Sequence, residues 1–200
     1  MRSDEDIAPY GGAATMDVLM HKGTVTLETE RLILRRYSIS DAEVMFRNWA
    51  NDPQVAEYMT WEKHPNVEFT RELLAGWVEE YAKENNYFWC IVLKEIGEPI
   101  GSISVVGINE QALSAEIGYG MSRAFWGKGI MPEALHAVLR FLFVEVGFFR
   151  IHAKHDIRNP KSGRVMEKCG MRYEGTICDT YQKNNQVAEF KQYAILRTEI

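Results

Sequence analysis

The sequence predicts an α/β (α+β) domain, a central sheet with helices on both of its faces, on the basis of three observations. Residues 87–94 are apolar on both sides of an alternating pattern, which is typical of a central strand buried on two faces. Residues 99–108 follow across a glycine turn, so the two runs form a hairpin. A strand over residues 112–121 then passes through a turn with two glycines into a helix that starts near Gly127 or Lys128 and extends to about Val146.

Length and composition bound the class of protein. Its 200 residues suit a single domain with a sizeable core, and its formal charge of −5 disfavours a general nucleic-acid binder. No apolar run is long enough to span a bilayer, and no spacing typical of a metal site occurs. The three cysteines are far apart and odd in number, which fits a reducing cytoplasm.

The other elements follow from periodicity and from capping and breaking residues. Residues 1–23 begin with an acidic run and show no sustained period, so we expect a flexible tail before a domain over residues 24–200. The remaining expected elements are a strand over 24–37, a helix from Ser40 to the break at 51–53, a short helix over 53–58, a helix over 67–83 capped by Asn66, a strand over 150–157, a helix that ends at Gly170, and strands over 173–180 and 187–196.

The strand over residues 112–121 has one nearly bare face. That face carries Ser114, Glu116, Gly118 and Gly120. The opposite face carries Leu113, Ala115, Ile117, Tyr119 and Met121. Because glycines in a strand often mark the close approach of a ligand or another backbone, we expect room beside Glu116.

The turn after this strand, Arg-Ala-Phe-Trp-Gly-Lys-Gly-Ile-Met over residues 123–131, suits an anion. Glycines let a backbone come close, and the first N–H groups of a helix have no partner inside the helix. A Walker A loop fails here, since Ser122 and Gly129 stand where a glycine and a serine or threonine are needed. A dinucleotide fingerprint fails as well, because its third glycine would fall on Pro132 or Arg123.

The turn instead resembles the acyl-CoA loop of the GNAT acetyltransferases, Gln/Arg-x-x-Gly-x-Gly/Ala. It is similar in particular to the ribosomal-protein N-acetyltransferase branch, in which Trp-Gly-Lys-Gly often stands in the loop. Trp126 replaces the usual Gln or Arg, Gly129 keeps the central glycine, and Met131 replaces the final small residue. The resemblance implies a mixed, mostly antiparallel sheet, splayed near strands 4 and 5 and opened at the strand that carries Glu116.

A second stretch resembles the other signature of this family. Asn159-x-x-Ser162 is followed by Arg-Val-Met-Glu-Lys-Cys-Gly-Met over residues 164–171, at the expected distance after the loop. Asn159 is also well placed as a helix N-cap before Pro160, which would explain it without a ligand. The two signatures together imply that acetyl-CoA is bound by Met121, Trp126, Gly127, Lys128, Gly129, Ile130, Met131, Asn159 and Ser162.

Acetyl transfer to an amine needs a base, because the amine is mostly protonated at neutral pH. Glu116 is our candidate base, as the only acid on the open strand face, where many family members place one. Asp179 is the alternative acid, and a surface carboxylate or ion-pair partner is the structural alternative for Glu116. The region of the family that corresponds to the loop over residues 59–65 flanks the acceptor, so Trp61 is an expected substrate residue, although it would also fit as an ordinary loop aromatic. Tyr119 is the other expected substrate residue.

The sequence does not identify the residue that acts as the general acid. Met166 stands where many GNAT enzymes have a tyrosine, so Ser162 becomes the catalytic candidate by resemblance to the ribosomal-protein branch. Tyr173, Tyr181 and bulk water remain alternatives. An acyl-cysteine route through Cys169 or Cys178 is disfavoured, since Cys169 lies in an apolar run.

The sequence therefore predicts a cytoplasmic, acetyl-CoA-dependent N-acetyltransferase. The acceptor is a protein or peptide N-terminus or a small amine. We expect no metal, nucleic-acid partner or membrane attachment, and a monomer or homodimer. The alternative is a non-catalytic acyl-CoA sensor or regulatory protein, which Met131 and Met166 keep open.

Overall fold

The computed structural model describes residues 18–181, 184 and 186–200 and contains one eight-stranded sheet in the order β1-β2-β3-β4-β5-β6-β8-β7. Only β5 and β6 pair in parallel, so the sheet is mixed and mostly antiparallel, as expected. The strands are β1 (Leu27–Glu28), β2 (Leu32–Arg35), β3 (Phe88–Leu93), β4 (Glu98–Asn109), β5 (Ser114–Met121), β6 (Arg150–Asp156), β7 (Arg172–Thr180) and β8 (Val187–Leu196).

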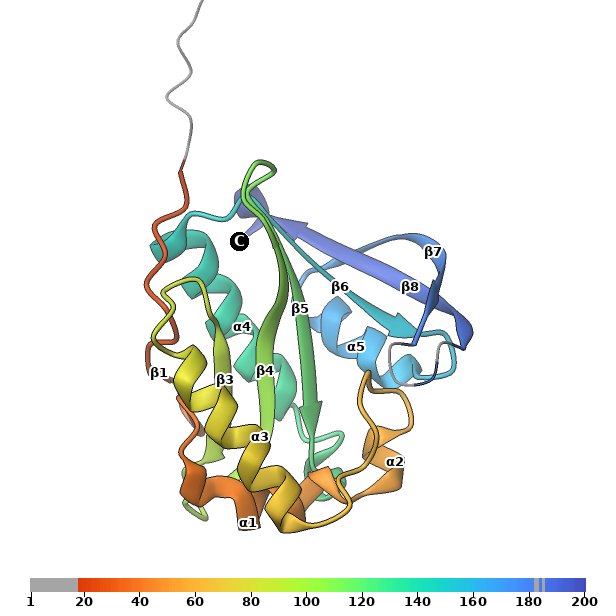
Figure 1. Ribbon diagram of the computed structural model, residues 1–200. Helices are drawn as coiled ribbons and strands as arrows, with labels where there is room; N and C mark the ends of the chain where they lie inside the picture. The colour runs from red at the N-terminus through yellow and green to blue at the C-terminus, as the bar shows by residue number, and fades with distance from the viewer. Residues whose placement is uncertain (1–17, 182–183, 185) are drawn as a thin grey trace, which may run out of the picture.

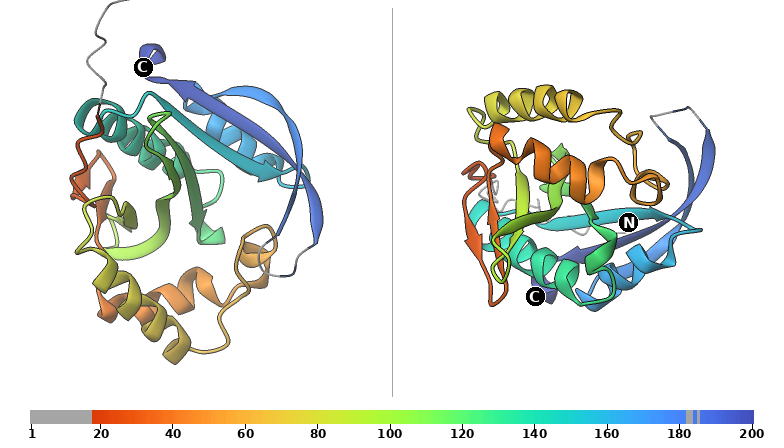
Figure 2. Two further views of the ribbon diagram at one scale, coloured as in Figure 1. Left: turned by 45° about the horizontal axis from the view of Figure 1, so that its top comes forward. Right: turned by 90° about the horizontal axis from the view of Figure 1, so that it is seen from below.

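Helices cover both faces of the sheet, which confirms the predicted fold class (Figures 1 and 2). The α-helices are α1 (Ala42–Met45), α2 (Pro53–Ala56), α3 (Val67–Glu80), α4 (Ile130–Phe141) and α5 (Pro160–Lys168). In the right-hand view of Figure 2, α1 and α3 lie on one side of the sheet, and α4 and α5 lie on the other.

Strand β3 lies at the centre of the packing, because its two faces enter different cores. Trp89 and Ile91 belong to the larger cluster, which contains the apolar stripe of α4. Cys90 and Val92 belong to the smaller cluster beneath α1 and α3. Burial on both faces explains why this run is continuously apolar, and it confirms the expected central strand.

The sheet forks between β5 and β6. Residues Ser114, Ala115 and Glu116 pair with Arg150, Ile151 and His152, and the pairing of β5 with β6 ends there. Beyond Glu116, β5 stays paired only with β4, whereas β6 continues along β8. Figure 1 shows the two strands separating toward their C-terminal ends. The predicted splay is confirmed, because the fourth and fifth strands expected from the sequence, over residues 112–121 and 150–157, are β5 and β6.

Two predicted boundaries were wrong. Residues 24–37 do not form one strand, because the chain turns at Thr29, whose N–H donates to Leu32 O at 3.0 Å, and makes the β1–β2 hairpin. Helix α4 starts at Ile130 rather than near Gly127. Gly127 and Gly129 have φ of +77° and +73°, a left-handed conformation that a right-handed helix excludes.

Part of the expected tail is described, and it packs on the domain. Leu19 is buried, and His21 Nδ1 lies 2.7 Å from the Tyr87 hydroxyl. Residues 1–17 lie outside the described part of the chain, so the flexible tail stays a prediction. None of the helices in the described residues has both the length and the apolar character needed to cross a bilayer.

Candidate active site

A cleft of about 980 Å³ lies where β5 and β6 diverge. Because the sheet is open there, the cleft is lined by residues from both sides of the sheet, including residues of α3 on one side and of α5 on the other. Glu116 of β5 and Lys154 of β6 lie on its inner walls, and Asn159 and Ser162 come from the first turn of α5. The cleft thus brings together the predicted catalytic residues, the second signature and both expected acceptor residues, Trp61 and Tyr119.

The glycine loop presents free backbone N–H groups at the start of α4. Among the described residues, the N–H groups of Gly127, Lys128 and Gly129 donate to no protein acceptor. A side chain on Gly127 would point into open space, since none of the described residues apart from its two chain neighbours has an atom within 4 Å of its Cβ position. Gly129 occupies the N-cap position of α4, where the N–H of the next residue, Ile130, has no partner within the helix.

The apolar residues of the predicted cofactor set divide into two groups. Met121, Ile130 and Met131 are buried in the larger core, so only their backbone atoms are available to a ligand at the loop. Trp126 is partly exposed, and its indole N–H donates to Met121 O at 2.8 Å, which fixes the ring at the end of β5.

Two lysines lie near the loop with their ammonium groups over aromatic rings. Lys161 Nζ is 5.1 Å from the centre of the Trp126 ring, and Lys128 Nζ is 5.2 Å from that of Phe125. Cations above ring faces are held electrostatically while remaining hydrated. They add positive charge beside the free N–H groups, as an anion site requires.

Asn159 stands at the N-cap of α5, but its side chain makes no capping hydrogen bond. Within the described part of the chain its amide has no hydrogen-bond partner, although it is half-buried and lines the cleft. The capping explanation of this residue is therefore wrong. The amide is available to a ligand that passes between β5 and α5.

Tyr119 and Ser162 form a hydrogen-bonded pair across the fork. The Tyr119 hydroxyl donates to Ser162 O at 2.9 Å, and Ser162 Oγ donates to the Tyr119 oxygen at 3.0 Å. Burial raises the pKa of Tyr119 well above its usual value, despite the hydrogen bond from Ser162. Tyr119 is thus a neutral group at physiological pH and holds the first turn of α5 against β5.

Glu116 faces a lysine and a histidine of β6. Its carboxylate lies 3.6 Å from Lys154 Nζ and 3.8 Å from His152 Nε2, and its side chain is 27% exposed. Lys154 also donates to Asp179 Oδ2 at 2.7 Å, so the two predicted acids share one cation. Burial lowers the pKa of His152, so its imidazole is neutral at pH 7.

Lys154 is a residue that the sequence reasoning missed. Burial would lower its pKa, but the hydrogen bond to Asp179 and the charge of Glu116 raise it above its usual value. Its place opposite Glu116 follows from the β5–β6 register, in which Glu116 pairs with His152. Alternation along β6 then sets Lys154 on the same face as His152, but only the register could have identified it from the sequence.

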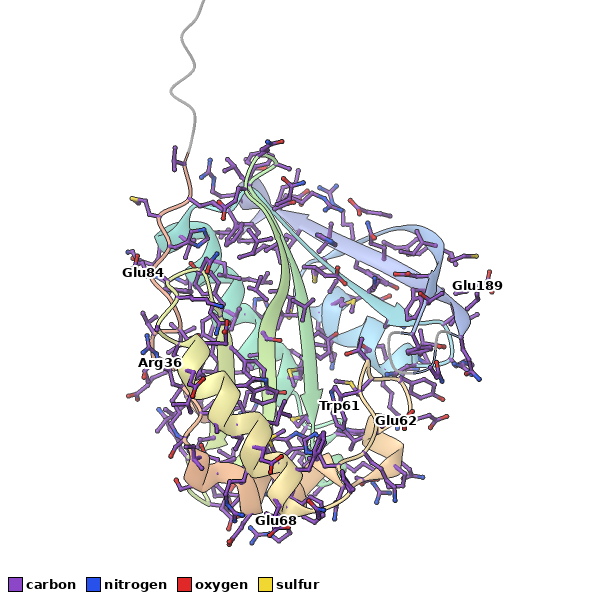
Figure 3. All side chains as sticks on the ribbon, viewed as in Figure 1. Arg36, Trp61, Glu62, Glu68, Glu84 and Glu189 are labelled. Carbon is purple, nitrogen blue, oxygen red and sulfur yellow. The ribbon has the colours of Figure 1, made fainter. Side chains whose placement is uncertain are left out.

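Three aromatic rings, those of Trp61, His64 and Phe69, form a wall on the acceptor side of the cleft. Figure 3 labels Trp61. The ring centres of Trp61 and His64 are 5.5 Å apart, and those of His64 and Phe69 are 5.0 Å apart. His64 is buried, its Nδ1 lies 2.8 Å from Thr70 Oγ1, and burial lowers its pKa, so the wall is uncharged at pH 7.

The bare face of β5 is partly filled. A side chain on Gly118 would come within 3.1 Å of Val106 Cγ1, and one on Gly120 within 3.0 Å of Met59 Cε. The glycines therefore admit protein side chains, and the open space lies beside Glu116 and the fork. Cys169 is buried, and burial raises its thiol pKa to about 12, so it is not a nucleophile at neutral pH.

A family model and known proteins that resemble this sequence all point to the same family. The sequence matches the family described as Acetyltransferase (GNAT) domain over residues 31–172, a span that contains the glycine loop and α5. The uncharacterized N-acetyltransferase p20 of Bacillus licheniformis is 30% identical over 174 residues, covering 87% of this chain and 97% of p20.

More distant relatives have the same kind of name or fold. The ribosomal protein uS5-alanine N-acetyltransferase of Escherichia coli (strain K12) is 26% identical over 163 residues, covering 78% of this chain and 82% of that enzyme. Among solved structures, an acetyltransferase of the GNAT family from Bacillus anthracis aligns with a TM-score of 0.76 at 27% identity, covering 88% of this chain and 100% of that one.

Proposed function

The chain belongs to the GNAT acetyltransferases, and we propose that it transfers an acetyl group from acetyl-CoA to a primary amine. The observation that carries this proposal is the fork between β5 and β6, where the uncapped amide of Asn159 and the carboxylate of Glu116 line one cleft. A thioester held between the strands would lie within reach of an amine entering from the opposite face of the sheet.

The cofactor half of the site is built from the residues of both signatures. The free N–H groups of the loop would hold the diphosphate at the positive end of α4. The Asn159 amide and the unpaired backbone edge of β5 would hydrogen-bond the pantetheine arm. The donors fit the ligand, since they are neutral or positive and have no acceptor in the part of the protein that the structure describes.

Glu116 acts as the general base in this proposal. An ammonium acceptor gives one proton to the carboxylate, the amine nitrogen attacks the thioester carbon, and the C–N bond forms as the C–S bond breaks. The second proton of the nitrogen ends on the departing thiolate, which gives free CoA thiol. Asp179 is less suited as a base, because Lys154 hydrogen-bonds it directly and holds its pKa below the usual range.

Ser162 is the proposed proton donor to the thiolate, and the pair with Tyr119 supports this role. The Ser162 hydroxyl donates a hydrogen bond to the Tyr119 oxygen, and the Tyr119 hydroxyl donates one to Ser162 O. As Ser162 protonates the thiolate it takes up the second proton of the acceptor nitrogen, so one proton passes from nitrogen to sulfur through its hydroxyl. The two hydroxyls form a short chain at the fork, so either one can supply a hydrogen bond to a developing thiolate.

The acceptor is a protein or peptide N-terminus or a small amine. The uncharged wall that contains Trp61 and Phe69 favours an amine whose neighbouring group is apolar. We place the reaction in the cytoplasm, which is consistent with three cysteines that are free thiols.

The test is a thiol-release assay with acetyl-CoA and a panel of peptides and small amines, repeated on Glu116→Gln. We expect kcat to fall at least about a hundredfold, as for loss of a general base, with acetyl-CoA affinity within about twofold of the native value. Glu189→Gln is the matched control, an exposed acid on β8 outside the cleft (Figure 3). Binding of acetyl-CoA without turnover on any acceptor would instead favour the sensor.

A further inference from the structure

Arg31, the residue just before β2, contacts the glycine loop from outside the cleft. Its Nη1 donates to Lys128 O at 3.1 Å, and its Nη2 donates to Gly129 O at 3.2 Å. One guanidinium therefore holds two successive carbonyls of the loop. A lysine could not reproduce this arrangement, since its three N–H donors lie on one nitrogen atom and not on the separate nitrogens of a planar fork.

These contacts help to set where the loop N–H groups point, together with the backbone N–H of Glu133, which donates to Gly129 O at 3.3 Å. In a trans peptide the C=O and N–H bonds are antiparallel and lie in one plane. Holding Lys128 O toward Arg31 therefore directs the Gly129 N–H away from Arg31, and holding Gly129 O does the same for the Ile130 N–H. Both glycines of the loop have positive φ, so without a restraint the chain could take several other conformations at little cost.

Arg31 is itself held by Glu133 in the first turn of α4. Its Nε donates to Glu133 Oε2 at 2.6 Å, and its backbone N–H donates to Oε1 at 2.9 Å. Thr29 Oγ1 donates to the same Oε1 at 2.5 Å. Burial would raise the pKa of Glu133, but these hydrogen bonds hold it below the usual range, so the carboxylate is ionised at neutral pH.

We propose that Arg31 is a positioning residue that preorganises the glycine loop for the diphosphate of acetyl-CoA. The inference rests on the proposed function, because it assumes that the loop binds this cosubstrate. Arg31 acts through the loop carbonyls and touches neither the thioester nor the acceptor. Its effect should therefore be confined to ligands that carry the diphosphate.

The experiment compares acetyl-CoA with S-acetylpantetheine, which has the same thioester but no diphosphate or nucleotide, on native protein and Arg31→Lys. We expect the Kd and KM for acetyl-CoA to rise about tenfold, with kcat at saturation within about twofold. The kcat/KM for S-acetylpantetheine should not change. Arg140→Lys, an exposed arginine on α4 that does not contact the loop, is the matched control.

Several outcomes separate this proposal from its premise. Native protein that binds no acetyl-CoA would overturn the proposed function together with this inference. Native-like acetyl-CoA binding by Arg31→Lys, or an equal loss for both thioesters, would overturn the inference alone. Glu133→Gln, which leaves Arg31 in place, should give a smaller loss with the same selectivity for acetyl-CoA, and circular dichroism checks that each variant is folded.

Discussion

The sequence is compatible with two roles for Asn159, as a helix cap and as a cofactor-binding residue, and its side chain distinguishes between them. An asparagine at an N-cap usually accepts a hydrogen bond from the N–H two or three residues later. Here it makes no such bond, and its amide lines the cleft between β5 and α5. The sequence could predict the position of Asn159, but the side-chain direction depends on how α5 packs across the fork.

Asp156, at the end of β6, is a buried acid that the sequence reasoning did not select. Its Oδ2 accepts from Arg158 Nη2 at 2.7 Å and from the Tyr181 hydroxyl at 2.6 Å. Burial alone would raise its pKa, but these hydrogen bonds lower it to about 2. The charged form is therefore favoured in the folded state and anchors the chain just before α5.

This shift predicts a pH-dependent loss of stability in Asp156→Asn. Because the folded pKa lies below the unfolded value of about 3.9, the stabilisation is complete above that pH and is lost as pH falls through 2. We expect the free energy of unfolding to drop by about 1–2 kcal/mol at pH 7. Urea unfolding of native and variant protein should show the difference shrinking between pH 4 and pH 2.

The control for this prediction is Asp179→Asn, which removes a more exposed acid. Its ion pair with Lys154 is partly solvated, so we expect a change below about 1 kcal/mol. If Asp156→Asn lowered the free energy of unfolding by the same amount at pH 7 and pH 3, the charge of Asp156 would not be what stabilises the connection between β6 and α5.

At the scale of elements, the sequence predicted most helices and strands, but it predicted their first and last residues less well. The helix α3 cap at Asn66 was confirmed, since its side chain accepts from Phe69 N–H at 2.8 Å. Such signals are local, so they can be read from neighbouring residues. The break in residues 24–37 is a turn between Thr29 and Leu32 that an alternating strand pattern does not mark. Glu133 adds hydrogen bonds to Thr29 and Arg31 from a distant helix, which no local pattern contains.

The seating of α5 on β6 gives a prediction for Gly163→Ala. A Cβ at Gly163 would lie 2.5 Å from Nε2 of the buried His155, so either the His155 ring or the helix must shift. We expect a loss of about 1–3 kcal/mol in stability from overpacking. We also expect a higher KM for acetyl-CoA, because Asn159 and Ser162 belong to the same helix end. Thermal unfolding and steady-state kinetics measure the two effects.

Gly76→Ala is the matched control, a glycine within α3 with nothing near its Cβ position. It should leave kinetics unchanged and stabilise the protein by about 0.4–1 kcal/mol, since alanine lowers the entropy of the unfolded chain. If Gly163→Ala is as stable and active as Gly76→Ala, α5 does not rest on His155 as described.

For the whole molecule, the fork in the sheet is what turns separate motifs into a site. Glu116, Asn159 and Trp61 come from three different regions of the chain, and all three line the cleft that opens where β5 and β6 separate. The glycine loop does not line this cleft. It lies at the end of β5, at the start of α4. Family resemblance predicted this fork. Strand patterns alone could not, because each strand is regular and the separation arises only from their pairing.

The acceptor half of the site was the least predictable from sequence. Trp61 lies in a loop whose position is set by contacts with His64 and Phe69, and these follow no helix or strand period. Lys154 became recognisable only through the register that brings it beside Glu116. A single sequence does not show which residues of distant strands or loops will lie side by side in the folded protein.

The central claim is that acetyl-CoA binds at the glycine loop, and calorimetric titration of native protein, Gly127→Val and Gly97→Val with acetyl-CoA tests it most directly. Both glycines have positive φ, +77° and +67°, and both have open space at the Cβ position, so valine strains each backbone alike. We expect binding to native protein and Gly97→Val and at least a tenfold weaker affinity in Gly127→Val. No binding to native protein, or equal binding to both variants, would contradict the account.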